Sequence, residues 1–402
     1  MDELRKLILY QSFLTIAEQS AGYFILWRLL GIVGLVVAYA LITFGGYLIP
    51  FIQLLASPII NKSKNKVKIL KIFYLLDVVI IASLYPLFIY LSGIKPIFIA
   101  IFIVVSVFAF FVKSVEYLTL DVLIKSIVRK YSEEVYLINK YNLVALGIGH
   151  VLGAAIVSLS ILMNLMIIVA IAVAGLFFLL SVGNVEVKAP ENPSYLVSFR
   201  KAFSILKNSE ILRKIMIFEV AYSLPNSLFS LFLVYLVYYV LLLPPVLIGI
   251  WSIVNISGNL LGVRFGYKLK PNKTVLLLMF LLSDISFLIF LFITNDLLIA
   301  MAYLSTFLSA TVGGFIRYYY SFIDYSSLIP TEEYATVTSM MSSIKTFANA
   351  IVTVTSALIV DVISYQAAVL LAVALFAILD FNYVPFFLKL MHLRDKTESS
   401  KK

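Results

Sequence analysis

The amino-acid sequence predicts an all-α membrane protein in which twelve transmembrane helices form two similar six-helix bundles. Apolar residues make up 62% of the 402 residues and charged residues only 13%, whereas soluble domains have about 45–50% apolar and about 25% charged residues. Apolar runs of about 20 residues, the length that crosses a bilayer, recur along the whole chain. Charged residues inside these runs also recur at similar places in the two halves of the sequence.

Twelve apolar runs are the predicted membrane spans. The six in the N-terminal half cover residues 7–27, 32–60, 67–92, 95–120, 136–162 and 165–183. The six in the C-terminal half cover residues 211–241, 245–268, 273–294, 296–323, 334–360 and 364–388. None alternates polar and apolar residues with a period of two, which favours helices over strands. We therefore expect an N-terminal bundle at 1–183, a cytoplasmic linker at 184–210, a C-terminal bundle at 211–390 and a cytoplasmic tail at 391–402.

The distribution of Lys and Arg predicts the orientation. Basic residues gather on the cytoplasmic side of membrane proteins, and most of the 31 Lys and Arg residues fall in the termini, the linker and alternate loops. Both termini are therefore expected in the cytoplasm, with the protein in the plasma membrane. The segment SYLVSFRKAFSILKNSE (194–210) spaces its apolar residues as a helix does. It is either an amphipathic helix on the inner leaflet or an ordinary basic linker.

Composition also excludes several classes of function. The chain has no cysteine and only two histidines, His150 and His392, which leaves little with which to build a thiolate or zinc site. The net charge of +10 is explained by cytoplasmic loops, so we expect no nucleic-acid partner. The sequence has no phosphate-binding Gly-x-x-x-x-Gly-Lys-Ser/Thr loop and no Asp-x-x-x-Asp motif of membrane enzymes that act on lipids. We expect no enzyme activity, no catalytic residue, no metal and no cofactor.

Internal repetition is visible in the charged residues of the spans. Each of four residues in the N-terminal half has a chemically similar residue roughly 200 positions later, as expected for a duplicated six-helix unit. The pairs are Glu18 with Glu219, Lys113 with Arg317, Asp121 with Asp324 and Asp77 with Asp284.

Local sequence around the loops agrees with a known family. EEVYLINKYNLVALGIGHVLGAA (133–155) leads into a helix that carries Gly149 and Gly153, and IPTEEYATVTSMMSS (329–343) is the matching segment of the second half. With the six-plus-six arrangement, these segments make the whole chain resemble the major facilitator superfamily of secondary transporters. The central segment FRKAFSILKNSEILRKI (199–215) is similar to that of the drug- and siderophore-efflux branches. SPIINKSKNK (57–66) departs from the family's gating loop, because it places Asn61 and Lys62 where that loop has Asp and Arg.

The resemblance implies which spans line a central cavity. In that fold the first, fourth, seventh and tenth helices line it, the second, fifth, eighth and eleventh flank it, and the others stand outside. An ionisable side chain in a bilayer costs at least ~2.5–3.5 kcal/mol, so each needs a partner, a water-filled cavity or a role. Glu18 is expected either to carry a proton or to be a structural carboxylate paired with a base such as Lys345. Glu219 is expected either to couple protons or to form a gating ion pair.

Other polar residues of these spans are candidates for solute binding. Lys113 and Glu116 are placed to pair at i, i+3, and His150 is either a titrating group or a packed hydrogen-bond donor. The predicted binding residues are Gln11, Tyr222, Asn226, Lys113, Arg317, Lys345, Asn349, Asn255 and His150. The predicted gating residues are Asp121, Asp324, Asn61 and Lys62. The outer-span residues Asp77, Asp284 and Asp380 are interpreted as structural.

The resemblance also implies a function. We expect a monomer that uses alternating access, coupled to protons or another ion, to move a small molecule across the lipid bilayer. Proton-coupled efflux of an amphipathic or hydrophobic compound is the first expectation. The alternative is proton-coupled uptake, or uniport, of a small polar or anionic metabolite.

Overall fold

The computed structural model consists of helices throughout its described part. It describes residues 2–33, 48–58, 60–61, 63, 65–128, 131–156, 159–183, 185, 195–235, 245–269, 272–292, 296–325, 328–362 and 365–399. The N-terminal half contains α1 (Glu3–Val33), an apolar helix at Leu48–Pro58, α3 (Lys66–Tyr90), α4 (Lys95–Ile127), α5 (Tyr131–Ile156) and α6 (Ile161–Leu180). The C-terminal half contains α8 (Glu210–Tyr235), α9 (Pro245–Lys268), α10 (Lys273–Ser286), the 3₁₀ helix η2 (Phe287–Leu291), α11 (Asp296–Tyr325), α12 (Tyr334–Val362) and α13 (Tyr365–Ser399). Every predicted span therefore coincides with helix wherever the chain is described.

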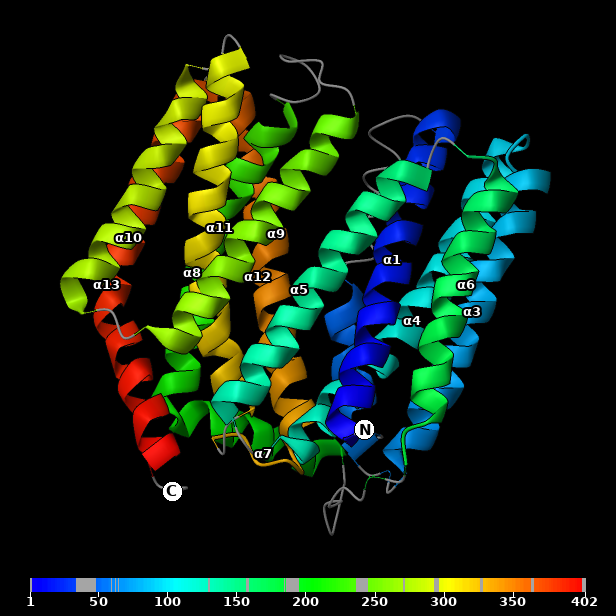
Figure 1. The fold of residues 1–402 in the computed structure, drawn as a ribbon, viewed down its shortest axis with the longest axis horizontal. Helices are drawn as coiled ribbons and strands as arrows, with labels where there is room; N and C mark the ends of the chain where they lie inside the picture. Colours follow the sequence, from blue (N-terminus) through cyan, green and yellow to red (C-terminus); the bar gives the residue numbers. More distant parts are fainter. Residues whose placement is uncertain are drawn as a thin grey trace. The chain divides into compact units, whose positions relative to one another are not determined.

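A further helix, α7 (Tyr195–Asn208), occupies the predicted linker. Its 14 residues are too few to cross a bilayer. It lies at the end of the molecule where α1 begins (Figure 1).

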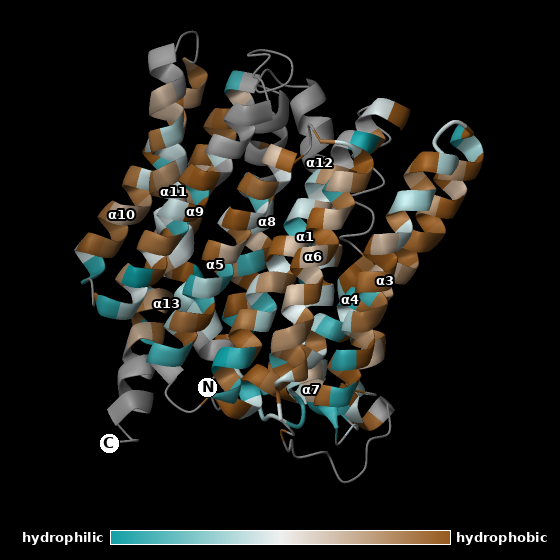
Figure 2. Ribbon diagram, turned by 45° about the vertical axis from the view of Figure 1, so that its right-hand side comes forward, coloured by the Kyte–Doolittle hydropathy of each residue, from teal (hydrophilic) through white to brown (hydrophobic). Residues whose placement is uncertain are grey.

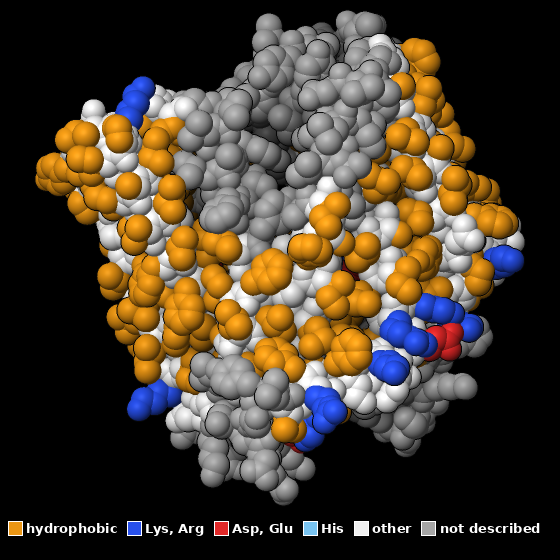
Figure 3. Space-filling model, turned by 180° about the vertical axis from the view of Figure 1, so that it is seen from behind, with side chains coloured by type: hydrophobic (Ala, Val, Ile, Leu, Met, Phe, Trp, Pro, Cys, Tyr) orange, Lys and Arg blue, Asp and Glu red, His pale blue; other side chains and the backbone are white. Residues whose placement is uncertain are grey.

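Most of the strongly apolar helices are those predicted to stand on the outside, and α4 is the exception. Within the described part, five helices are long and apolar enough to cross a membrane, namely α3, α4, α6, α10 with η2, and the stretch Val369–Met391 of α13. Four of these are the third, sixth, ninth and twelfth spans, and Figure 2 shows how strongly hydrophobic residues dominate them. Large apolar side chains such as Phe177 and Phe381 project from them, each 69% exposed, and hydrophobic side chains cover much of the surface in Figure 3. These surfaces are suited to contact with lipid tails.

The helices pack as two compact units, which exchange one segment each. Unit 1 comprises Met1–Arg129, Val144–Asn208 and Ile329–Ser343, and unit 2 comprises Lys130–Leu143, Ser209–Leu328 and Ile344–Lys402. The first part of α5 thus packs in the unit that holds the C-terminal spans. The first part of α12 packs in the unit that holds the N-terminal spans.

Inside unit 1, glycines let α5 approach α1 closely. A Cβ added at Gly149 would lie 2.7 Å from the Cβ of Gln19 and 3.2 Å from the backbone of Ile16. Gly153, one turn later, packs equally tightly against Ser20 and Tyr23. Gly149 and Gly153 in the fifth span therefore allow α5 to pack closely against α1.

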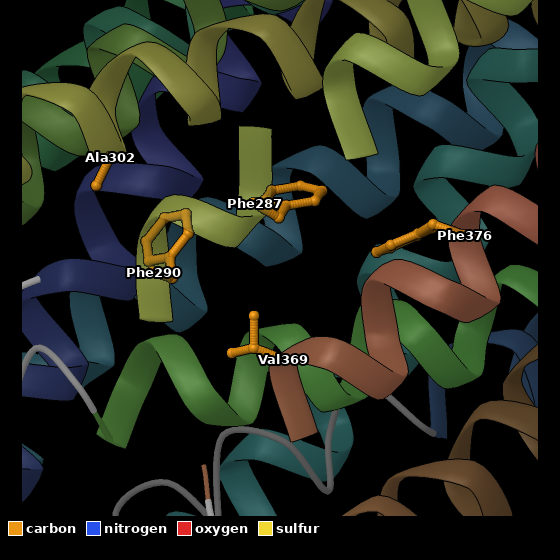
Figure 4. Close-up of a cluster of buried hydrophobic side chains, with 5 residues drawn as sticks. All are labelled: Phe287, Phe290, Ala302, Val369 and Phe376. Atoms are coloured by element: carbon orange, nitrogen blue, oxygen red, sulfur yellow. The ribbon is translucent and has the colours of Figure 1, made fainter. Parts of the chain in front are cut away.

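Inside unit 2, α9 and α11 are in still closer contact. A Cβ at Gly262 would overlap the carbonyl oxygen of Thr311, and a Cβ at Gly314 would overlap that of Asn259. A separate apolar cluster joins η2, α11 and α13 through Phe287, Phe290, Ala302, Val369 and Phe376 (Figure 4). The close contact between α9 and α11 requires glycine, because no side chain fits between the two backbones. The apolar cluster requires large side chains that fill the space between η2, α11 and α13.

Candidate functional site

The carboxylate of Glu18 forms an ion pair inside unit 1. Lys113 Nζ on α4 lies 3.2 Å from Glu18 Oε1, and the side chain of Glu18 is only 8% exposed. The hydroxyl of Tyr117, one helical turn after Lys113, donates a hydrogen bond to Glu18 Oε2. The structural alternative predicted an ion pair of Glu18 with a basic residue such as Lys345. That choice of base is wrong, because Glu18 pairs with Lys113.

A second carboxylate, that of Glu116, is buried beside this pair. Tyr10 on α1 donates its hydroxyl hydrogen to Glu116 Oε1, and both side chains are completely buried. The ring of Tyr10 packs edge-on against Tyr74 of α3, with the ring centroids 5.0 Å apart. The expected pairing of Lys113 with Glu116 along α4 is not formed, because Lys113 reaches across to α1 and Glu116 takes its hydrogen bond from Tyr10.

A third carboxylate, that of Asp77 on α3, was interpreted from sequence as structural. The structure leaves it 1% exposed, and neither oxygen has a hydrogen-bond partner among the described residues. Asp77 lines a cavity of about 190 Å³ together with Glu18 and Lys113. The other walls are mainly apolar side chains of α1, α3 and α4. Sequence reasoning missed Asp77 because it assigned the third span to the outside of the fold.

The counterpart of Glu18 in unit 2 pairs with a different helix. Lys345 Nζ on α12 lies 2.9 Å from Glu219 Oε1 on α8. One turn further along α8, Tyr222 packs against Phe218 and Phe376, with centroid distances of 4.1 and 5.6 Å. The Tyr222 ring therefore extends the apolar cluster of unit 2.

Polar contacts fasten both exchanged segments. In unit 2, Arg317 Nε on α11 donates to Asn139 Oδ1 at 3.2 Å, and Ser321 donates to the same oxygen at 3.3 Å. In unit 1, the predicted gating residue Asn61 donates from Nδ2 to Thr336 Oγ1 at 2.9 Å. Sequence reasoning did not single out Asn139 or Thr336, since each is an ordinary polar residue near the start of a span.

Two further contacts hold the segment 329–343 in unit 1. Lys201 Nζ on α7 lies 3.7 Å from Glu333 Oε1, and the ammonium group of Lys125 lies 5.0 Å from the ring centroid of Tyr334. Burial raises the pKa of Glu333, and the nearby charge of Lys201 partly offsets that rise. The ion pair of Lys201 with Glu333 thus joins the linker helix α7 to the segment 329–343 of unit 1.

The remaining predicted residues are more dispersed. His150 on α5 packs edge-on against Tyr23 of α1 at 5.5 Å, and Asn255 Oδ1 accepts a hydrogen bond from Asn259 within α9 at 2.8 Å. Three others are half-buried on their helices: Gln11 on α1, Asp121 on α4 and Asn349 on α12. Lys62 and the side chains of Asn226 and Asp324 lie outside the described residues. In the described part, no three or more His, Cys, Asp or Glu residues are grouped to hold a metal ion.

Comparison with known proteins finds similarity in structure only. No family model and no curated protein sequence matches the chain. A bacterial homologue of the iron transporter ferroportin in an outward-facing state superimposes with a TM-score of 0.69 at 16% identity, covering 95% of this chain and 99% of that one. The human organic anion transporter MFSD10 gives 0.68 at 13% identity, covering 94% and 97%. The major facilitator transporter FucP in its outward conformation gives 0.66 at 16% identity, covering 96% and 98%. The chain therefore has the major facilitator fold, in which twelve membrane helices form two pseudo-symmetric six-helix bundles.

Proposed function

We propose that this protein is a secondary active transporter that moves a small molecule across the plasma membrane by alternating access and couples this movement to protons. The fold supports transport, because the solved structures that share it include a homologue of an iron transporter, an organic anion transporter and a nucleoside transporter. One of them, FucP of E. coli, is a fucose:proton symporter. We propose that the chain works as a monomer, with both termini in the cytoplasm.

The observation that carries proton coupling is the buried pair of Glu18 and Lys113. Protonation of Glu18 removes its negative charge and with it the ionic attraction to Lys113, which is one of the contacts that join α1 to α4. An uncompensated ammonium group in a low-dielectric interior is unfavourable, so Lys113 must then find another partner or reach water. Binding and release of one proton can therefore change how two helices of unit 1 are held together.

The exchanged segments are the proposed inner gate. The contact of Asn61 with Thr336 and that of Asn139 with Arg317 each join one predicted bundle, 1–183 or 211–390, to the other. If the two bundles rock about a central site, these hydrogen bonds have to break when the cytoplasmic side opens. The contact of Asn61 with Thr336 joins two uncharged side chains, and that of Arg317 with Asn139 has a charge on one side only. Breaking either hydrogen bond costs less free energy than breaking a buried ion pair.

Efflux of an amphipathic or hydrophobic compound remains the first choice of solute and direction. It rests on the similarity of residues 199–215 to efflux branches of the superfamily. The alternative, uptake or uniport of a small polar or anionic metabolite, needs a basic side chain that is available to an anion. Lys113 and Lys345 are each held in an ion pair, and Arg317 binds Asn139, so this arrangement favours the first choice.

The test is proton movement in energised inside-out membrane vesicles. Lipophilic cations, weak acids, sugars and amino acids are added in turn, and the internal pH is followed with a proton-sensitive dye. We expect one class to release protons with the wild type and not with Glu18→Gln. Glu210→Gln is the matched control, since Glu210 is an exposed carboxylate that pairs with Lys214 at 2.6 Å. Solute movement without a proton signal in the wild type would show that Glu18 has a structural role.

A further inference from the structure

We propose that the cavity between α1, α3 and α4 is a binding site for an organic ammonium ion, whose charged group is held by Asp77 beside the Glu18–Lys113 pair. The cavity lies inside unit 1, and every described residue that lines it comes from these three helices. The proposal goes beyond the proposed transport function, with which it shares the Glu18–Lys113 pair.

The first argument is the balance of charge. Glu18 and Asp77 are buried carboxyl groups that line the cavity, and Glu116 on α4 is a third buried carboxyl group that does not line it. Lys113 is the one basic residue that lines the cavity in the described part of the chain. The ion pair of Lys113 uses one of these carboxylates. The surplus acidic groups favour the entry of a positive charge, since an unpaired buried carboxylate is strongly unfavourable.

The second argument is that the three carboxyl groups differ in their partners. Tyr117 donates to Glu18, and Tyr10 donates to Glu116. Asp77 receives no hydrogen bond from any described residue at either oxygen, although only 1% of it is exposed. Glu116 Oε2 also lacks a hydrogen-bond partner among the described residues, but Glu116 does not line the cavity, and Glu18 Oε1 is paired with Lys113. Asp77 is therefore the carboxylate that a ligand in the cavity can satisfy.

The third argument is the size and lining of the cavity. A volume of about 190 Å³ exceeds the roughly 150 Å³ of an engineered protein cavity that binds benzene. Beyond the charged end, the walls are formed by side chains such as Ile25, Ile80, Leu84 and Phe102. A bare metal ion would leave this apolar space unfilled. A primary amine on a small apolar body fits both ends, because its ammonium group meets the carboxylates and its hydrocarbon part meets the apolar walls.

The structure also supplies a matched control in the other half of the chain. Asp284 on α10 is the counterpart of Asp77, is 3% exposed and likewise has an oxygen without a hydrogen-bond partner among the described residues. It does not line this cavity. Asp284→Asn removes a buried carboxylate of the same kind without touching the proposed site.

The experiment measures binding to the purified full-length protein in detergent by isothermal titration calorimetry. Benzylamine, which is a cation at neutral pH, is compared with benzyl alcohol and benzoate of similar size. We expect only benzylamine to bind, Asp77→Asn to weaken its binding at least tenfold and Asp284→Asn to leave it within twofold of wild type. Ala109→Leu, which enlarges a side chain in the cavity wall one turn before Lys113 and keeps every carboxylate, is expected to abolish binding and so gives a second test if Asp77→Asn does not fold.

Several results would overturn the proposal. Equal binding of benzyl alcohol would show an apolar cavity without charge recognition, and preferential binding of benzoate would show that Lys113 dominates. Competition by sodium that is stronger than competition by caesium at equal ionic strength would assign the carboxylates to an inorganic cation. Loss of binding in Asp284→Asn as large as in Asp77→Asn would assign the effect to general destabilisation. Because no proton gradient exists in detergent, failure of binding leaves the transport proposal standing, and failure of vesicle transport leaves the binding result standing.

Discussion

The ammonium group of Lys113 lies 3.2 Å from the carboxylate of Glu18, and the pair joins α4 to α1. The acid of unit 2 in the equivalent span, Glu219, pairs instead with Lys345 on α12. Arg317, the sequence counterpart of Lys113, binds Asn139. The duplicated sequence thus keeps the position of its acidic residue in both halves while the partner comes from different helices. Protonation of Glu18 and of Glu219 consequently acts on different helix contacts.

Removing the base of the Glu18 pair should destabilise the protein more than removing both partners. Lys113→Met leaves the Glu18 carboxylate buried without a counter-charge, which costs about 3 kcal/mol, the low end for buried pairs, because the Lys113 side chain is 21% exposed. The thermal midpoint in detergent should therefore fall for Lys113→Met and recover in part when Glu18→Gln is added. Midpoint losses that simply add in the double variant would contradict a direct interaction between the two side chains.

Enlarging a glycine between α9 and α11 should prevent correct packing of unit 2. Gly262→Ala places a methyl group on the backbone of Thr311, where no flexible side chain can give way. We expect a large loss of folded, monodisperse protein in size-exclusion chromatography. Gly31→Ala on α1 is the control, since a Cβ at Gly31 meets nothing within 4 Å, and its yield should stay at the wild-type level.

The contact of Asn61 with Thr336 should hold the exchanged segment of unit 1 closed. Thr336→Val keeps the side-chain shape, removes the hydroxyl and leaves the buried amide of Asn61 without this partner, at a cost of about 1–3 kcal/mol. Ala335→Cys reports the opening, because Ala335 is fully buried and the chain has no cysteine of its own. A membrane-impermeant maleimide should label it several times faster in inside-out vesicles once Thr336→Val is added.

Thr338→Val is the control for this labelling experiment. The Thr338 hydroxyl donates only to backbone oxygens of its own helix region, Tyr334 at 2.7 Å and Ala335 at 3.3 Å. Its removal should not change the labelling rate of Ala335→Cys. Equal acceleration by both valine variants would mean that the contact with Asn61 does not hold the segment.

Glu3 should give the protein a small stability component that disappears in acid. Its hydrogen bond with Lys6 at 2.6 Å, and that from the Gly183 amide at 2.9 Å, lower the pKa of Glu3 from its ordinary value. A lowered pKa in the folded state adds stability above the unfolded value, and this stability is lost as the pH falls through the folded value. Since the Glu3 side chain is 35% exposed, solvent screening limits the effect to about 0.5 kcal/mol.

The measurement for Glu3 is the thermal midpoint as a function of pH. Glu3→Gln should unfold at a lower temperature than wild type at pH 7. The difference should shrink as the pH falls below the usual range of a carboxyl group and vanish once the pH is below the lowered pKa of folded Glu3. Asp2→Asn, a neighbouring change, should show no such dependence. A difference that persists unchanged in acid would show that the contact does not depend on charge.

The helices could be predicted from sequence because hydropathy and length are local properties. The described helices overlap the spans predicted from apolar runs, although α13 continues to Ser399, well beyond the predicted end at residue 388. Glu18, Glu219 and Lys345 lie within helices, as predicted. The partners of those charges could not be predicted. Lys113, Arg317 and Lys345 are three bases in spans, and no local pattern says which of them faces which acid.

The position of Asp77 beside Glu18 and Lys113 could not be predicted for a related reason. A helix on the outside of the fold still has one face toward its own bundle, and the lateral position of a span does not reveal which residues lie on that face. Tyr74 and Asp77, one turn apart on α3, are both turned inward and almost fully buried. The exchange of the segments 130–143 and 329–343 was equally hidden, because it depends on contacts between residues far apart in the chain.

The borrowed segment 329–343 has a consequence for biosynthesis. Unit 1 is built mainly from the first half of the chain, but Thr336 and Glu333 reach it only after more than three quarters of the protein has left the ribosome. During translation the side-chain amide of Asn61 has no Thr336 hydroxyl to bind until that residue is synthesised. The first bundle is therefore inserted before the segment 329–343 can pack in unit 1. Chain elongation at about 5–20 residues per second makes this delay many seconds. A protein cut in the linker could therefore complete either unit only by assembling with its other half.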